Sequence, residues 1–262
     1  MQRVLIIAGS DPSGGAGIQA DIKTVTCLGG FAMTAITALT VQNTLGVTGV
    51  LPVAPDMITA QAIACLDDIG ADALKTGMLG DAAVMHAVAG VMDATSAFKV
   101  VDPVMVAKGG HPLLAEQAIS ALKAIMLPRA DLLTPNAPEA AALTGLPVTN
   151  ESDMHRAGLA LLEAGARAVL LKGGHLPGEE VVDLLFTANQ TFRFAAARIE
   201  TVHTHGTGCT LASACAALWR PDRPLNETVA LARDYVLGAI VTAPGLGHGH
   251  GPLRHNWVLP RV

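Results

Sequence analysis

Hydrophobic residues along the chain gather in short runs typical of β-strands, and these runs alternate with longer stretches of small residues. The first run, 3–8 (RVLIIA), predicts a buried strand, and 16–28 predicts a helix that ends at a pair of glycines. β-Branched residues are dense over 31–43, which predicts a second strand running to a polar tip. Such alternation is typical of βα units and a mostly parallel sheet.

The same alternation continues to the end of the chain. Further strands are expected at 71–77, 98–103, 131–136 and 166–171, and helices from Pro55 to about Ile69, from Asp81, from Leu113, over 207–219 and over 225–242. Residues 180–199 contain two apolar runs around a polar turn at 188–190, which predicts a hairpin at a sheet edge. No repeat or linker interrupts the pattern, so we expect one α/β domain over residues 1–262.

Polar residues and glycines follow the predicted strands where each one ends. Ligands of open α/β sheets bind where the carboxyl ends of the strands meet the following loops. The candidate site positions are therefore Gly9-Ser10-Asp11, Gln42-Asn43, Gly77-Met78, Asp102-Pro103, Thr134-Pro135-Asn136 and Lys172-Gly173-Gly174.

Composition narrows the class of protein. The chain has 262 residues, of which 51% are hydrophobic, 15% charged and 3% aromatic, and this favours helices packed closely on a sheet over disorder. The formal net charge is −5 and the basic residues are scattered, which argues against nucleic acid or an anionic membrane as a partner. A bound phosphate would have to be held locally.

The four cysteines show no C-x-x-C spacing, which favours reduced thiols. The first apolar run breaks at Gly9, too early for a signal peptide, and later apolar runs are interrupted by polar residues before they reach membrane-spanning length. We therefore expect a cytoplasmic protein.

The loop 9–21 contains G-A-G-I-Q-A at 15–20, a relaxed form of the dinucleotide-binding fingerprint. A dinucleotide site would also need an acidic residue at the end of the next strand, and 31–47 contains none. A Walker A loop is missing too, because no glycine precedes Lys23. Close helix–strand packing explains these glycines better, although it leaves Asp11 and Asp21 without a role.

The stretch 203–217 (HTHGTGCTLASACAA) places a glycine turn directly before a predicted helix. Gly206-Thr207-Gly208 can turn backbone amides inward, and the free amides and dipole of the helix would attract an anion. The same dipole would shift Cys209 towards thiolate, so the thiol could accept a proton from an attacking hydroxyl near neutral pH. A small packing residue is the alternative, and it is the interpretation we favour for Cys215.

Histidines suggest metal binding at two places. His203, His205 and Cys209 lack a nearby fourth ligand, which argues against zinc. For His248, His250 and His255, a glycine-rich closing loop with solvated or hydrogen-bonded histidines is the simpler interpretation.

Two carboxylates, Asp102 and Glu139, lie at strand ends in apolar or proline-rich surroundings. Carboxylates near phosphates are typical of a Mg²⁺ site, although Glu139 would also be favourable in the first turn of a helix capped by Asn136. Lys172 precedes two glycines, which suggests a nucleotide phosphate or ribose nearby.

With these residues in place, the chain resembles a known family over essentially its whole length. The motifs AGSDPSGGAGIQADIKT, ITALTVQNT, KTGML, VVDPVMVAKGG, LLTPNAPEAAALTG, LLKGGH, HTHGTGCTLASA and GHGHGP are similar to those of bacterial hydroxymethylpyrimidine/phosphomethylpyrimidine kinases, lidless members of the ribokinase-like superfamily. The resemblance implies a three-layer α/β/α sandwich without a separate lid domain, ATP and Mg²⁺ as cofactors, a small pyrimidine substrate and a homodimer.

The resemblance also implies roles for individual residues. Gln42 would hydrogen-bond the aminopyrimidine ring, while Asp102 and Glu139 would face Mg²⁺. The other roles implied are pocket lining for Gly9, Asp21 and Met78, ATP binding for Asn136, Lys172 and Thr207, an anion hole for Gly206, Gly208 and Cys209 with Cys209 as the base, and contact with the substrate phosphate for Lys108. The loop 107–112 (AKGGHP) departs from the family pattern at Gly110 and His111, which leaves the role of that loop open.

The implied reaction transfers the γ-phosphoryl group of ATP first to a hydroxymethyl group and then to the phosphate of the product. The second step needs little base, so we expect Cys209→Ala to slow the alcohol reaction more than the monophosphate reaction. A vitamin B6 kinase, which also acts on a ring bearing a hydroxymethyl group, and a non-catalytic pyrimidine sensor are the alternatives.

Overall fold

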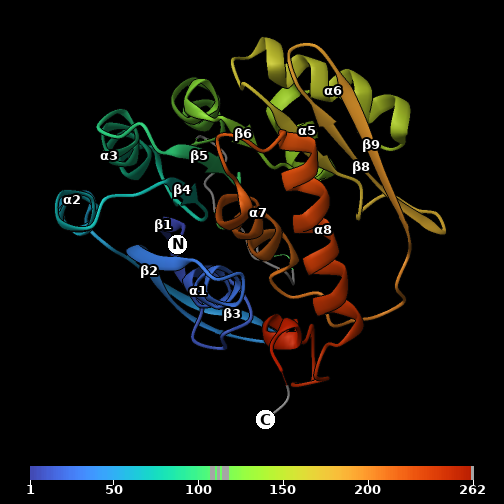
Figure 1. Cartoon of the computed structure of the whole chain (residues 1–262), viewed down its shortest axis with the longest axis horizontal. Helices are drawn as coiled ribbons and strands as arrows, with labels where there is room; N and C mark the ends of the chain where they lie inside the picture. The colour runs from blue at the N-terminus through green and yellow to red at the C-terminus, as the bar shows by residue number, and fades with distance from the viewer. Residues whose placement is uncertain (107–109, 111–112, 114–117, 261–262) are drawn as a thin grey trace.

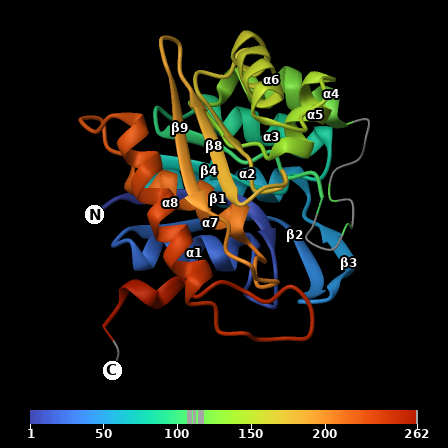
Figure 2. The ribbon, with the colours of Figure 1, turned by 90° about the vertical axis from the view of Figure 1, so that its right-hand side faces the viewer.

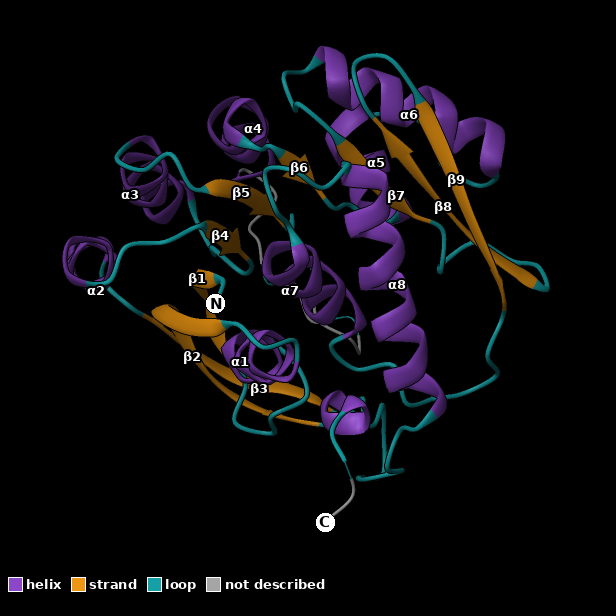
Figure 3. Cartoon of the chain, viewed as in Figure 1, coloured by secondary structure: helices purple, strands orange, loops and turns teal. Residues whose placement is uncertain are grey.

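A nine-stranded sheet runs through the computed structural model, which describes residues 1–106, 110, 113 and 118–260 (Figures 1 and 3). The strand order is β3-β2-β1-β4-β5-β6-β7-β8-β9. The strands are β1 (Arg3–Ser10), β2 (Phe31–Asn43), β3 (Gly46–Pro52), β4 (Ala73–Thr76), β5 (Phe98–Val101), β6 (Leu132–Leu133), β7 (Val169–Lys172), β8 (Glu180–Phe186) and β9 (Thr191–Ala197).

The six strands from β2 to β7 in this order run parallel, while β3 at one edge and the β8–β9 hairpin at the other run antiparallel. The carboxyl ends of the parallel strands are in register, with Thr76 opposite both Ile7 and Val101. The loops that follow these strands therefore open onto the same edge of the sheet.

Helices cover both faces of the sheet, as Figures 1 and 2 show. They are α1 (Gly17–Cys27), α2 (Pro55–Asp68), α3 (Ala82–Asp93), α4 (Ala118–Ala121), α5 (Ala137–Thr144), α6 (Glu151–Glu163), α7 (Thr207–Leu218) and α8 (Leu225–Val241). Helices α2 to α6 pack on one face and α1, α7 and α8 on the other. This arrangement confirms the three-layer α/β/α sandwich.

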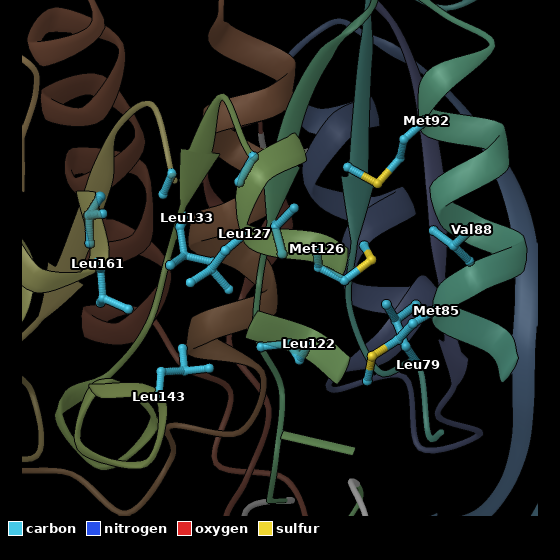
Figure 4. Close-up of a cluster of buried hydrophobic side chains, with 14 of the residues drawn as sticks. Leu79, Met85, Val88, Met92, Leu122, Met126, Leu127, Leu133, Leu143 and Leu161 are labelled. Carbon is cyan, nitrogen blue, oxygen red and sulfur yellow. The ribbon is translucent and has the colours of Figure 1, made fainter. Parts of the chain in front are cut away.

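Each face of the sheet has its own hydrophobic core because side chains alternate along a strand. Leu5 and Ile7 of β1 enter the core under α2 to α6, while Val4 and Ile6 enter the core under α1, α7 and α8. Figure 4 shows part of the first core, where methionines of α3 point towards Met126. Both cores are rich in aliphatic residues, and the buried methionines belong to the first core.

Two elements, β3 and α6, were not predicted, and some predicted elements differ in extent from those of the structure. Strand β3 was missed because most of its side chains are exposed, so it has no apolar periodicity. Helix α6 was missed because its charged residues mask the apolar face, although Asn150 caps it. Strand β6 is shorter than predicted. The start of the helix expected from Leu113 lies largely outside the described residues, and the part that is described continues beyond α4 as a π-helix, Leu122–Met126.

Candidate active site

A cavity of about 910 Å³ lies along the carboxyl edge of the sheet. Predicted strand-end residues that line it are Gly9, Ser10, Asp11, Gln42, Gly77, Met78, Asp102, Asn136, Lys172 and Gly174. The glycine turn before α7 adds Gly206, Thr207, Gly208 and Cys209, and α5 adds Glu139. Several segments far apart in the sequence therefore meet in one cavity.

The order of the strands in the sheet determines which side chains line each part of this cavity. Gln42 and Gly9 lie near the carboxyl ends of β2 and β1, Met78 follows β4, and these three residues form one end. Asp102 and Lys172 follow β5 and belong to β7, nearer the middle. The other end, beside the hairpin and α8, combines apolar residues with charged ones: Val181, Ala196, Val236 and Ile240 line it together with Asp183, Arg198 and Arg233.

At the first end of the cavity, Met78 lies close against Gly9. A Cβ atom on Gly9 would lie 3.1 Å from Sδ of Met78, so glycine lets this methionine lie directly against the backbone. Gln42 projects from β2 nearby, where Oγ1 of Thr40 lies 3.2 Å from one end of its amide. This end presents one amide among mostly apolar groups.

Asp11 and His205 form a buried pair beside Gln42, and sequence analysis assigned neither a role here. Nε2 of His205 lies 2.8 Å from Oδ2 of Asp11. Burial alone would raise the pKa of Asp11, but hydrogen bonds from His205 and Ser13 hold that pKa below its ordinary value. The same carboxylate accepts from the backbone N–H groups of Ser13 and Ala16, so it also shapes the loop before α1. The D-P-S-G stretch could have suggested such a capped turn.

Asp21, for which the family resemblance implied a place in the pocket, is not among the residues that line the cavity. Its carboxylate is fully buried behind the wall, where it accepts hydrogen bonds from Nζ of Lys75 at 2.8 Å and from Oγ of Ser213 at 2.7 Å. Lys75 itself lines the cavity and was missed by sequence analysis. Burial works against its ammonium group, but the Asp21 carboxylate raises the pKa of Lys75. A buried ion pair thus ties α1, β4 and α7 together.

The turn before α7 requires its glycines. Gly206 has φ of 80°, and a Cβ atom there would lie 1.8 Å from the carbonyl oxygen of Gly15. A Cβ atom on Gly208 would lie 3.3 Å from Nζ of Lys172, so the backbone of this turn faces that lysine. Oγ1 of Thr207 donates to the carbonyl of Thr204, which holds the turn closed. Free backbone amides at a helix N-terminus beside a cation form a favourable place for an anion.

The expectation of a Cys209 thiolate near neutral pH is wrong for this geometry. The thiol is half-buried at the foot of α7. Removal from bulk water raises its pKa to about 11, although Lys75 acts in the opposite direction. Desolvation is the largest effect on this thiol, and it favours the protonated form near neutral pH. Cys215 is fully buried in the core, as expected.

Asp102, Glu139 and Lys172 form a charged group at the middle of the cavity. Oδ1 of Asp102 accepts from Nζ of Lys172 at 3.1 Å and from Oγ1 of Thr134 at 3.0 Å. Burial would lower the pKa of Lys172, but both carboxylates raise it, so the lysine is charged. Burial raises the pKa of Glu139 to about 7, Lys172 opposes this shift, and Asp102 adds to it.

Asn136 and Glu139 form the capping box expected at the start of α5. The Asn136 side chain accepts from the backbone N–H of Glu139 at 2.9 Å, and Oε2 of Glu139 accepts from the backbone N–H of Asn136 at 2.7 Å. This reciprocal pair fixes the Glu139 carboxylate next to Lys172.

Lys108, which was expected to contact the substrate phosphate, lies outside the described residues. Within the described ranges, no group of three or more His, Cys, Asp or Glu side chains is arranged to hold a metal ion, and no helix is long and apolar enough to cross a bilayer.

Comparison with known proteins places this site in a family. The sequence pattern of the phosphomethylpyrimidine kinase family matches residues 11–254. The hydroxymethylpyrimidine/phosphomethylpyrimidine kinase of Streptomyces coelicolor is 46% identical over 98% of this chain and 95% of its own length. The thiamine biosynthesis bifunctional protein ThiED of Geobacter sulfurreducens is 49% identical over 96% of this chain, which spans only 52% of that longer protein.

A solved structure matches the fold closely as well. The ADP complex of Bacillus subtilis pyridoxal kinase superposes with a TM-score of 0.91 at 34% identity, covering 98% of both chains. The sequence matches and this ribokinase-like fold agree with the glycine turn, the charged group and the cavity described above. The chain therefore belongs to the phosphomethylpyrimidine kinase family.

Proposed function

We propose that this chain transfers the γ-phosphoryl group of ATP to 4-amino-5-hydroxymethyl-2-methylpyrimidine and then to the resulting monophosphate. The observation that carries the proposal is the position of Lys172 and the α7 glycine turn between two ends of one cavity. One end offers an amide for a polar ring, and the other is apolar enough for a purine. An in-line transfer between two bound molecules needs this arrangement.

The protein's contribution to the transfer is mainly electrostatic. The substrate hydroxyl oxygen bonds to the γ-phosphorus as the bond to ADP breaks, and the hydroxyl proton is released. Lys172 and the backbone amides of Gly206, Gly208 and Cys209 would stabilise the charge on the phosphoryl oxygens. Cys209, being protonated, is placed to donate a hydrogen bond there rather than to act as a resident base.

Mg²⁺ fits the same part of the cavity. Asp102 and Glu139 are hard oxygen donors from different elements, and their mutual repulsion helps to raise the pKa of Glu139. A divalent cation would relieve that repulsion, and Mg²⁺ typically takes few protein ligands and keeps several waters. When bound, the ion would neutralise phosphate charge. Asn136, at the cap of α5, belongs to the proposed nucleotide side of the cavity.

Pyridoxal kinase activity is the second candidate, because the ADP complex of a pyridoxal kinase shares this fold so closely. Steady-state kinetics with Mg-ATP separate the two activities. We expect kcat/KM for hydroxymethylpyrimidine to exceed the values for pyridoxal and pyridoxine, and the reverse order would contradict the proposal. Ring binding without ADP release would favour the sensor instead.

Three further properties stay predictions: a single domain over residues 1–262, a cytoplasmic location, and a homodimer. The homodimer has support in the exposed apolar side chains of Val41, Leu45 and Leu51, which lie on and between β2 and β3 and are each at least 64% exposed. Such side chains at a sheet edge favour association with a second copy.

A further inference from the structure

The buried pair of Asp11 and His205 contacts the one side chain proposed to read the substrate ring. Both side chains are at most 5% exposed, and the His205 ring packs on the backbone of Gly15, where a Cβ atom would lie 2.3 Å from it. On its other side, Nε2 of His205 lies 3.4 Å from one end of the Gln42 amide. The hydrogen atoms available to these groups determine which end of the amide lies there.

The first hydrogen count concerns His205. Asp11 accepts hydrogen bonds from Ser13, Ala16 and His205, as an ionised carboxylate does, and a carboxylate has no hydrogen to give. Nε2 of His205 must therefore carry the hydrogen between them. This hydrogen points to Asp11 at 2.8 Å, and the Gln42 amide lies farther from the same nitrogen, at 3.4 Å. An amide NH₂ group would face an N–H group of like polarity there, so the favoured end is the amide oxygen, which can share this hydrogen weakly.

The second hydrogen count concerns Thr40 and is independent of the first. Its hydroxyl has one hydrogen and lies 2.9 Å from the carbonyl oxygen of Ser10 and 3.2 Å from the other end of the Gln42 amide. The Ser10 carbonyl can only accept, so it takes that hydrogen. The amide end facing Thr40 must then donate, which makes it the NH₂ group. Exchanging the two ends of an amide preserves its shape, so one orientation satisfies both counts.

We propose that the Asp11–His205 pair is a positioning device that holds the Gln42 amide with its oxygen towards His205 and its NH₂ group towards Thr40. The consequence for the substrate rests on the proposed function. An aminopyrimidine gives a hydrogen from its amino group to the amide oxygen and accepts one at the adjacent ring nitrogen. The amino group then lies on the His205 side.

This orientation points the reacting group at α7. The hydroxymethyl group sits on the ring carbon next to the amino-bearing carbon, on the side away from the paired ring nitrogen. His205 directly precedes Gly206, so a ring held with its amino group on the His205 side directs its hydroxymethyl group towards the glycine turn. The reversed amide would turn that group away. His205 acts through Gln42 and is therefore a specificity-determining residue without reacting itself.

Long-range ¹H–¹⁵N correlation spectra of the ligand-free protein, labelled at histidine, test the His205 tautomer on which the first hydrogen count depends. The His205 signals are identified by their loss in His205→Gln. We expect Nε2 of His205 to carry a hydrogen. An unprotonated Nε2 would overturn the proposal, because that nitrogen would then be free to accept from Gln42. This measurement needs no substrate and no active variant.

Kinetics test the consequence for the ring. His205→Phe keeps a ring against Gly15 but has no hydrogen to donate, and we expect it to raise KM for hydroxymethylpyrimidine about tenfold or more while KM for ATP stays within about twofold. His205→Gln, which retains an N–H donor, should recover most of the loss. The exposed His248 supplies the control, His248→Phe, which should match the wild type.

An unchanged KM for the pyrimidine in His205→Phe, or equal losses in His205→Phe and His205→Gln, would overturn the positioning role. If the wild-type protein phosphorylates pyridoxal but no pyrimidine, the proposed function fails, and the spectra still decide which nitrogen of His205 carries the hydrogen.

Discussion

At the scale of single residues, Cys209 shows how burial can raise the pKa of a thiol at the start of a helix. A dipole acts on a thiol through its own partial charges, but a thiolate also loses hydration in a cavity wall, and here that loss raises the pKa to about 11. A protonated thiol also removes the reason for expecting Cys209→Ala to affect the two phosphorylations unequally.

Alkylation measures the ionisation of Cys209. At pH 8 only about one thiol in a thousand would be ionised, so modification by iodoacetamide should rise about tenfold per pH unit between pH 7 and 10. Peptide mass spectrometry follows this cysteine separately from Cys27, Cys65 and Cys215. Rapid modification that levels off near pH 7 would contradict the raised pKa and support a Cys209 thiolate.

Glu139 gives a second prediction at this scale, about stability. Its pKa is raised from 4.5 to about 7 in the folded state, so the folded protein holds a proton that the unfolded chain has already lost. Stability should therefore fall as the pH rises through that interval. We expect Glu139→Gln, which can keep the capping box, to gain up to about 3 kcal/mol relative to the wild type at pH 8 and much less at pH 4.5.

Urea unfolding without Mg²⁺ at the two pH values provides the measurement for Glu139. A difference between variant and wild type that does not change with pH would show that the carboxyl group has an ordinary pKa.

At the scale of elements, the start of α7 depends on a close approach between two loops. Gly206→Ala would bring a Cβ atom against the Gly15 carbonyl in addition to the cost of a positive φ. We expect it to lower the free energy of unfolding by about 3 kcal/mol or more and to abolish most activity. Gly80 has a similar φ of 77° with no atom within 4 Å, so Gly80→Ala should cost only about 1 kcal/mol. Equal losses in urea titrations would refute the close approach.

Sequence periodicity could predict most elements of this fold but not all of its site. The parallel strands and the helices that cover them follow from apolar runs, and strand ends led to Asp102, Asn136 and Lys172. The ion pair of Lys75 and Asp21 was not predicted, because a lysine inside an apolar strand gives no sign of its partner. The two residues are 54 positions apart in the sequence. His205 escaped because its partner, Asp11, is 194 positions away. Burial and long-range pairing are properties of the folded chain.

At the scale of the whole molecule, the exposed apolar side chains of β2 and β3 predict association. Light scattering after size-exclusion chromatography should give twice the chain mass for the wild type, and Leu51→Lys should shift it towards the monomer. Leu159 on α6 is 53% exposed on another part of the surface, so Leu159→Lys should leave the mass unchanged. A monomeric wild type would contradict the homodimer.

The single cavity has a consequence for how two phosphorylations follow one another. In the proposed reaction, Gln42 anchors the ring at one end, and the glycine turn of α7 marks one place for phosphoryl transfer. After the first transfer, the new phosphate would occupy the space that the next acceptor oxygen must enter, so the ring would have to retreat by about the length of one phosphate group. Such a shift would weaken the contact between Gln42 and the ring of the intermediate. Its escape into solution and re-entry would make the enzyme distributive, and free monophosphate would accumulate while unreacted alcohol competes for the same anchor.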